Sequence, residues 1–358
     1  MTIQALVDIS ISAARRTGGR AIVLYALLVC ALVVLVPLSA ALGAADYPLT
    51  TMWRAMLARA PAHDVADAGF VLWQLRLPRV CLAVMIGLHL AASGLTLQAA
   101  LRNPLAEPGV LGVSSGATLG VMLLVVLANV SGSFDSSRLY ANDTNWLPLA
   151  ALAGGIGAAL VVYALASRQG TAPHRLVLMG VAVGAALYAL AMTILAGWGS
   201  SRIEVLLTWL SGNLYARDWQ HVRVLAPWTA ATLALLPLVL PAAQVLALGD
   251  DAAASVGLAV ERWRLAAIAY AGLAAAGAVA IAGPIAFVGL IAPHLARRAV
   301  GGTLVAQAPC ALMIGALITA LADLVGRIAI APIEIPVGAV TAVCGGPLFL
   351  YLLTRPTR

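Results

Sequence analysis

Long, almost uncharged apolar runs alternate along the chain with short polar segments. The runs that reach about 20 residues cover positions 21–42, 80–101, 110–130, 146–167, 176–198, 222–241, 303–322 and 335–354, and their one formal charge is Arg223 near the start of its run. About 20 apolar residues in a helix cross the hydrocarbon core of a bilayer. The pattern therefore predicts an all-α integral membrane protein in which each of these runs is a transmembrane helix.

One further run, residues 265–293, is too long for a single crossing. Its 29 uncharged residues would form a helix of about 43 Å, whereas the apolar core of a bilayer is about 30 Å thick. Gly283 and Pro284 break the run into a seventh helix and a short eighth helix that ends near residues 294–298. The total is ten transmembrane helices, which places both termini on one side of the membrane.

The first run has an alternative interpretation as a cleaved signal peptide, since Arg15, Arg16 and Arg20 precede it. Its apolar stretch is longer than the usual signal core of 7–15 residues. We expect a first membrane helix preceded by a cytoplasmic N-terminus of residues 1–20. The whole chain, residues 1–358, is then one transmembrane domain.

The polar segments predict the connections. Residues 43–79 form a polar segment between the first two helices, residues 131–145 a loop and residues 168–175 a tight turn. The tryptophans of residues 199–221 favour an interfacial helix. In the segment 242–264, Asp250 and Asp251 follow Gly249 and suit the start of a short helix that Gly257 would stop.

The connection between the second and third helices is a sharp reversal. Pro104 and Pro108 cannot continue a helix, because proline lacks the backbone donor and its ring collides with the preceding turn. Small residues from Gly109 to Gly116 then open the next helix and permit another backbone to approach closely. Such a surface suits a pathway or a subunit contact.

Composition supports a membrane protein and excludes several functions. The chain is 62% hydrophobic and 10% charged, with a mean hydropathy of +0.99, whereas soluble domains carry about a quarter charged residues. The net charge of +7 is not gathered on one face, so it does not predict nucleic-acid binding. The chain contains no Lys, which a phosphate-binding P-loop requires. The four cysteines lie in apolar runs and are expected to be small core residues.

The distribution of charge gives an orientation and a symmetry hypothesis. Slightly more than half of the arginines fall on the side of the termini, a weak positive-inside bias. Helices two to five and seven to ten enter the membrane in opposite directions, as an inverted repeat requires. No sequence similarity between the two blocks supports that repeat.

The predicted helices offer little chemistry of their own. A proton-coupled secondary transporter usually places ionisable residues in mid-membrane, and here only His89 lies inside an apolar run. We interpret His89 as a neutral side chain bonded to a neighbouring helix, with a ligand contact as the alternative. No catalytic dyad, metal site or cofactor site is expected. The energy would come from a separate ATPase that acts on residues 248–262.

Several motifs occur in an order that is typical of one family. They are Arg76-Leu77-Pro78-Arg79, Arg102-Asn103-Pro104-Leu105-Ala106-Glu107-Pro108, Leu111-Gly112-Val113-Ser114-Ser115-Gly116-Ala117, Trp209-Leu210-Ser211-Gly212, Leu246-Ala247-Leu248-Gly249-Asp250, the stretch from Gly283 to His294, and Gly345-Gly346-Pro347-Leu348-Phe349. The chain closely resembles FecCD-like permease subunits of type II ABC importers, which take up iron-siderophores, haem and cobalamin. Ala286, where the family pattern has Gly, and His89, where it has a small apolar residue, depart from it.

The resemblance implies an assembly in the bacterial inner membrane. Its members have ten helices per subunit and form homodimers around one pathway, with two copies of an ATPase that binds ATP and Mg²⁺ and with a periplasmic substrate-binding protein. Both termini are then cytoplasmic, and this chain is not itself an enzyme. By resemblance, Arg76, Arg79 and Arg327 dock the binding protein through its acidic residues. The alternative is that Arg76 and Arg79 reach the headgroups and Arg327 pairs with Asp323.

The resemblance also assigns a gate and a coupling element. Asn103 and Leu105 correspond to the cytoplasmic gate. The segment that contacts the ATPase corresponds to Gly249, Asp250, Asp251, Ala252, Ala253 and Gly257, with a plain soluble connector as the alternative. Ala252 and Ala253 would allow close seating.

The cargo is a metal chelate whose identity the sequence does not specify. We favour haem because of His89, with a ferric siderophore or cobalamin as alternatives within the same class. An ion-coupled secondary transporter is the alternative from another class, and a membrane-embedded enzyme has no clustered chemistry to support it.

Overall fold

The computed structural model describes residues 19–43, 48–57, 63–130, 146–167, 173–198 and 203–354. The predicted cytoplasmic N-terminus of residues 1–20 lies outside this part except for the backbone of its last two residues, which begin the first helix. The predicted loop of residues 131–145 and most of the turn of residues 168–175 also lie outside it. Within the described ranges the fold is entirely helical, which confirms the predicted class.

All ten predicted membrane helices are present. They are α2 (Gly19–Ala41), α5 (Leu77–Ala100), α6 (Val113–Val130), α7 (Trp146–Ser167), α8 (Pro173–Trp198), α10 (Trp219–Leu246), α12 (Val260–Ala282), α13 (Val288–Val300), α14 (Leu304–Ile328) and α15 (Val337–Thr354). Seven are long and apolar enough to cross a membrane, while the apolar parts of α6 and α15 are shorter. The short α13 is the predicted eighth helix beyond the break.

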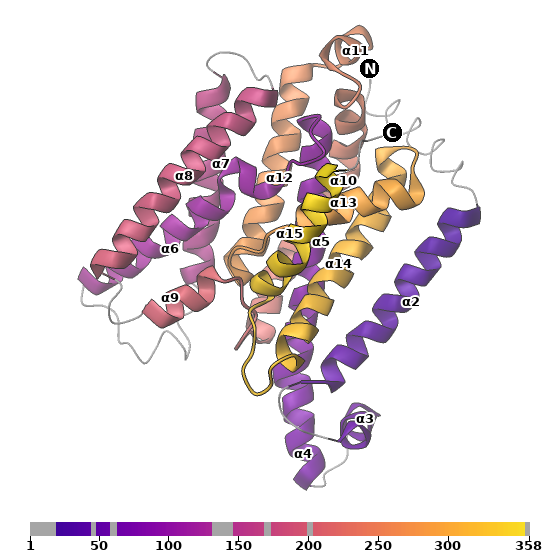
Figure 1. The fold of residues 1–358 in the computed structure, drawn as a ribbon, viewed down its shortest axis with the longest axis vertical. Coiled ribbons are helices and arrows are strands. Elements are labelled where there is room, and N and C mark those ends of the chain that lie inside the picture. Colours follow the sequence, from indigo (N-terminus) through magenta and orange to yellow (C-terminus); the bar gives the residue numbers. More distant parts are fainter. Residues whose placement is uncertain are drawn as a thin grey trace.

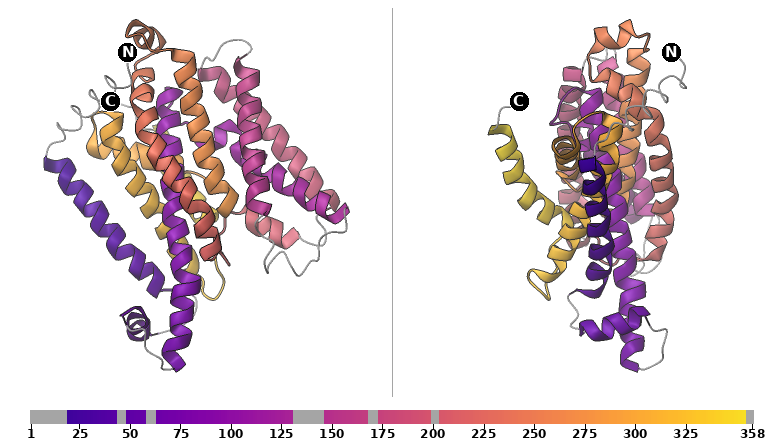
Figure 2. Two further views of the ribbon diagram at one scale, coloured as in Figure 1. Left: turned by 180° about the vertical axis from the view of Figure 1, so that it is seen from behind. Right: turned by 90° about the vertical axis from the view of Figure 1, so that its right-hand side faces the viewer.

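Helix α5 is the central element of the bundle. It packs against α10, α12, α13 and α14, and its side chains are buried over most of its length. Figures 1 and 2 show it running through the middle of the molecule, between α2 on one side and the α6, α7 and α8 group on the other. Few of its residues are therefore available to lipid.

The two blocks of helices repeat one pattern of packing. Helix α5 contacts α14 and its counterpart α12 contacts α7. Likewise α6 contacts α7 and its counterpart α13 contacts α14. These paired contacts are those that an inverted repeat of the two blocks requires. The start of α2, the end of α15 and the short α11 (Asp250–Ser255) lie toward the same end of the bundle (Figure 1).

The polar segment 43–79 is more helical than we predicted. It contains α3 (Leu49–Leu57), α4 (His63–Phe70) and a π-helical stretch, η1 (Val71–Arg76), which continues directly into α5. Pro78 lies inside this continuous helix and cannot donate to the preceding turn. The carbonyl of Trp73 in that turn instead accepts from Nε1 of Trp219 at 2.7 Å. Arg76 and Arg79 are thus part of a continuous helix.

The expected interfacial helix of residues 199–221 is short. It is α9 (Ile203–Leu210), and its Trp209 is buried against neighbouring helices. Helix α10 begins at Trp219 and continues through Pro241, further than predicted. Membrane helices tolerate internal prolines when neighbouring groups satisfy the freed carbonyls.

The cysteines are divided between the interior and the surface. All four are free thiols, and Cys310 is buried as expected. Cys30 and Cys344 are exposed on the outer faces of α2 and α15, which corrects the prediction that all four are core residues.

Candidate functional site

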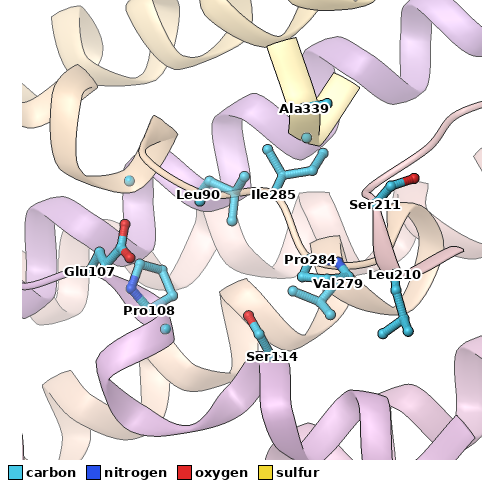
Figure 3. Close-up of a pocket in the computed structure, with 14 residues that line it drawn as sticks. Leu90, Glu107, Pro108, Ser114, Leu210, Ser211, Val279, Pro284, Ile285 and Ala339 are labelled. Carbon is cyan, nitrogen blue, oxygen red and sulfur yellow. The ribbon is translucent and has the colours of Figure 1, made fainter. Parts of the chain in front are cut away.

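Two irregular segments within the helical bundle border one cavity of about 400 Å³. One is the 3-10 turn η2 (Pro108–Leu111) with the residues before it, and the other is the break between α12 and α13. Figure 3 shows side chains from both converging with those of α5, α6 and α9. The lining residues are Leu90, Glu107, Pro108, Gly109, Ser114, Leu210, Ser211, Val279, Pro284, Ile285, Ala286, Gly289, Gly338 and Ala339. Irregular backbone inside a membrane protein is tolerated where it is buried or lines such a cavity.

The break after α12 depends on glycine. Gly283 has a φ of 75°, and a Cβ there would lie 2.1 Å from the carbonyl oxygen of Trp209. The segment after α9 lies against this break, because the N–H of Asn213 donates to the carbonyl of Ala282 at 2.8 Å. On its other side, the N–H of Gly338 at the start of α15 donates to the carbonyl of Gly212 at 2.9 Å. Three chain segments therefore meet at backbone contact distance beside the cavity.

Glu107 links the two irregular segments. Its Oε2 accepts a hydrogen bond of 3.3 Å from the backbone N–H of Phe287, the residue that precedes α13. Phe287 itself has a left-handed φ of 68°, a strained conformation for a non-glycine residue. Burial raises the pKa of the Glu107 carboxyl, and the Phe287 N–H opposes that rise only in part.

Helix α13 is also held against the C-terminal half of α5. The side-chain amide of Gln98 donates to the carbonyls of Gly289 and Leu290 at 3.4 and 3.3 Å, while its oxygen accepts from Arg297. At Gly94 a Cβ would lie 1.7 Å from the carbonyl oxygen of Gly289. The two backbones therefore pack in direct contact.

The predicted gate residues lie on the turn between α5 and η2. The side-chain oxygen of Asn103 accepts the N–H of Leu105 at 2.9 Å, which stabilises the turn locally. Leu105 is exposed. Their function as a gate stays a prediction.

The predicted coupling residues occupy two different environments. Asp250 is held by Arg102 at 3.1 Å and by Arg264, whereas Asp251 and Ala252 are exposed. Gly249 and Gly257, with φ values of 116° and 78°, flank the helix as predicted. Ala253 is fully buried against α10 and α12, so its side chain is not available for contact with another protein.

A cluster of charges lies at the opposite end of α5. Arg79 donates to Asp323 and to Glu334, at 2.7 Å in each case, and Arg327 donates to the other oxygen of Asp323 at 3.0 Å. Arg327 also donates to the carbonyls of Ser39 and Leu42 at 2.9 and 2.8 Å. The cluster thereby joins α2, α5 and α14.

The three arginines predicted to dock a binding protein are all part of this internal structure. Arg76 donates to the carbonyl of Ala41 near the end of α2, and a Cβ at Gly43 would collide with its guanidinium. Arg76 and Arg79 are each 6% exposed and Arg327 is 2% exposed. The alternative pairing of Arg327 with Asp323 is present, and Arg76 and Arg79 donate to protein groups. Docking through them stays a prediction.

His89 is a buried structural residue. It is 0% exposed, and its Nδ1 and Nε2 lie 3.0 and 2.9 Å from the carbonyl of Ala274 and the hydroxyl of Thr229. Because a carbonyl only accepts, Nδ1 carries a proton. His89 thus joins α5, α10 and α12 as the first interpretation predicted, and it is not among the residues that line the cavity.

Sequence reasoning did not identify the roles of Glu107, Gln98 and Glu334. Glu107 belongs to one of the quoted motifs, but the sequence analysis assigned it no role. An acidic residue beside a predicted pathway could have been recognised as a candidate site residue. Within the described ranges, no three His, Cys, Asp or Glu side chains lie close enough together to hold a metal ion.

Comparison with known proteins agrees with this arrangement. The pattern that defines the FecCD transport family matches residues 31–355. The Fe(3+)-citrate import system permease protein YfmE of Bacillus subtilis is 37% identical over 289 residues, which cover 81% of this chain and 83% of YfmE. The iron(3+)-hydroxamate import system permease protein FhuG of the same organism is 38% identical over 80% of this chain and 84% of its own.

A solved structure shares the fold. It is an inward-facing conformation of a metal-chelate type ABC transporter, with a TM-score of 0.76 and 28% sequence identity, over 92% of this chain and 98% of its own.

Proposed function

The chain belongs to the FecCD transport family, and from this premise we propose that it is the membrane-spanning permease subunit of an ATP-driven importer of a ferric chelate. The observation that carries the proposal is the cavity between two helix breaks in a helical bundle. Helix breaks of this kind mark the substrate path in many transporters, because they place backbone groups and mobile joints beside the cargo.

A ferric siderophore or ferric citrate is a better cargo than the haem that the sequence favoured. The preference for haem rested on His89, which is enclosed between three helices and is not part of the cavity lining. Two relatives carry the names of ferric citrate and ferric hydroxamate importers. Glu107 is the one formally charged residue that lines the cavity, so the path itself offers few charges for recognising a cargo.

The proposed assembly contains two copies of this chain, two ATPase subunits and a periplasmic binding protein in the bacterial inner membrane. The ATPase end is the one that carries α11, whose exposed Asp251 and Ala252 are available to a partner. Arg102, Arg262 and Arg264 lie near the same end, which suits the cytoplasmic side. Both termini would then be cytoplasmic, and ATP hydrolysis belongs to the partner, since this chain lacks the Lys of a P-loop.

At the opposite end we propose that the binding protein sits on the surface that the Arg79 and Arg327 cluster supports. The burial of these arginines favours an indirect role, in which they hold α2, α5 and α14 in place. Exposed residues of α3 and α4 would then make the direct contacts.

The test is uptake into proteoliposomes that contain this chain with its cognate ATPase and binding protein. Ferric citrate, a ferric hydroxamate and haem are compared as cargo, with and without ATP on the ATPase side. We expect ATP-dependent uptake of an iron chelate and weak uptake of haem. A liposome without the binding protein is the matched control.

An ion-coupled transporter is the competing function, and Glu107 is the observation that would favour it. Its buried carboxyl in the cavity is a group that could bind a proton. Uptake that ignores ATP, follows an imposed proton gradient and is lost in Glu107→Gln would establish that alternative and overturn the importer proposal.

A further inference from the structure

The predicted gate turn and the predicted coupling helix touch each other through one ion pair. Arg102 directly precedes Asn103, and its Nη2 lies 3.1 Å from Oδ1 of Asp250, the first residue of α11. The pair is therefore a direct connection between the two elements.

The backbone at Arg102 has an unusual conformation that fixes this contact. Its φ of 49° makes it one of only three non-glycine residues with positive φ in the described ranges. Arg102 N–H donates to the carbonyl of Ala99, and Asn103 N–H donates to that of Gln98. The turn is thus anchored to the end of α5 while the guanidinium extends toward α11.

Asp250 also pairs with Arg264, which is far more buried than Arg102. Arg264 of α12 donates to the same carboxylate oxygen, and its side chain is only 2% exposed. Separating a buried guanidinium from its carboxylate is costly, so the contact between Asp250 and Arg264 is the more permanent one. The side chains of Arg102 and Asp250 are 36% and 41% exposed, and an ion pair this accessible to water can break and reform at little cost.

The other end of the gate turn is held separately. Glu107 accepts the N–H of Phe287 at the start of α13, and α13 is packed directly on α5. A displacement of α11 would therefore act on the Arg102 end of the turn while the Glu107 end stays with α5 and α13. The turn that carries Asn103 and Leu105 would then change shape rather than move as a rigid body.

We infer that Arg102 is the positioning residue that transmits movement of α11 to the gate turn, through Asp250 held on Arg264. This inference rests on the proposed function. It identifies the contact through which the ATPase end of the protein would act on the predicted gate turn. Removing the pair should leave ATP hydrolysis intact while fewer chelate molecules cross for each ATP consumed.

The test uses the complete importer in proteoliposomes, with uptake and ATP hydrolysis measured on the same preparation. Two variants remove the pair. Arg102→Ala shortens the side chain, and Arg102→Gly also suits the positive φ, so the turn keeps its backbone conformation. Arg298→Ala is the matched control, because it also removes an exposed arginine, at α13, and none of the ion pairs seen in the described part of the chain involves Arg298.

We expect both Arg102 variants to lower the number of chelates transported per ATP by about fivefold or more, the lower range of ordinary coupling between sites. Arg102→Lys should recover part of the loss. Arg102→Ala combined with Asp250→Asn should lose no more than the stronger single variant, as residues that act through one contact do not add. Arg298→Ala should keep the wild-type ratio.

Two results would overturn the inference while leaving the proposed function standing. One is a wild-type ratio in Arg102→Gly, and the other is an equal loss in Arg298→Ala, which would assign the effect to the loss of any exposed positive charge. Wild-type protein that transports no chelate with ATP would instead contradict the proposed function itself.

Discussion

The guanidinium of Arg79 donates to a carboxylate oxygen of Asp323 at 2.7 Å, and both side chains are buried. The two residues are separated by 244 positions in the sequence and belong to α5 and α14. Arg327 binds the second oxygen of Asp323, so two buried guanidinium groups share one carboxylate.

Replacing Asp323 by Ala should destabilise the protein strongly. It leaves Arg79 and Arg327 buried without their shared carboxylate, and breaking a buried pair in this way costs about 3–5 kcal/mol. Thermal unfolding in detergent micelles measures the effect. Asp251→Ala removes an exposed acid and is the control, with an expected change below about 0.5 kcal/mol.

Thermal unfolding, together with a binding assay, distinguishes a structural role of Arg79 from direct docking of the binding protein. If Arg79 is structural, Arg79→Gln lowers the unfolding temperature together with the amount of folded protein. An Arg79→Gln protein with wild-type stability that no longer binds its periplasmic partner would instead support direct docking.

His89→Ala should lower stability without changing the preference among cargoes. The side chain joins three helices through the carbonyl of Ala274 and the hydroxyl of Thr229, and interhelical hydrogen bonds in membranes average about 0.6 kcal/mol each. The loss of packing adds to this. Uptake of haem and of a ferric hydroxamate, each scaled to folded protein, should fall in parallel. A selective loss of haem uptake would show that His89 meets the cargo.

Gly94→Ala should prevent normal packing of α5 against α13. The added Cβ would lie 1.7 Å from the carbonyl oxygen of Gly289, and both partners are backbone, so neither can rotate away. We expect loss of most folded protein in size-exclusion chromatography. Gly157→Ala in α7 is the matched control, because a Cβ there meets no atom within 4 Å. Normal yield from Gly94→Ala would contradict the close contact.

Glu107→Gln should be tolerated and should change the pH dependence of stability. The amide oxygen can still accept the Phe287 N–H, and the cost of burying a charge disappears. Because the folded-state pKa of Glu107 is raised, its contribution to stability is present below about pH 4.3, the ordinary Glu pKa, and is lost as pH rises through the folded pKa. Unfolding temperatures from pH 4 to pH 8 should show this decline in wild type and a smaller one in Glu107→Gln. Identical slopes would contradict the raised pKa.

The membrane helices could be predicted because the bilayer imposes their length and composition. Run lengths alone placed α7 at its observed ends and located the break at Gly283 and Pro284. The extent of α10 was underestimated, since its internal prolines look like helix ends when neighbouring segments are unknown.

The site could be predicted only where neighbouring positions determine the structure. The pairing of Asp323 with Arg327 follows from helical spacing, whereas the pairing of Arg79 with Asp323 depends on a contact between distant helices. Likewise, two adjacent alanines suggested a seat for the ATPase, but the way α11 packs buries Ala253 and exposes Ala252. Such differences depend on rotation about a helix axis, which a short segment does not reveal.

The central position of α5 has a consequence for how the protein is made. Its main partners α10, α12, α13 and α14 all follow it in the sequence, so the ribosome delivers α5 before the helices that cover most of it exist. Until α14 is inserted, Arg79 in the first turn of α5 lacks the carboxylate of Asp323. Newly made α5 must therefore remain in lipid or beside the insertion machinery, with its Arg79 end near water, until α14 is inserted. Synthesis that stops before α14 should yield a chain that is recognised and degraded, because the face of α5 that α14 covers then has no partner.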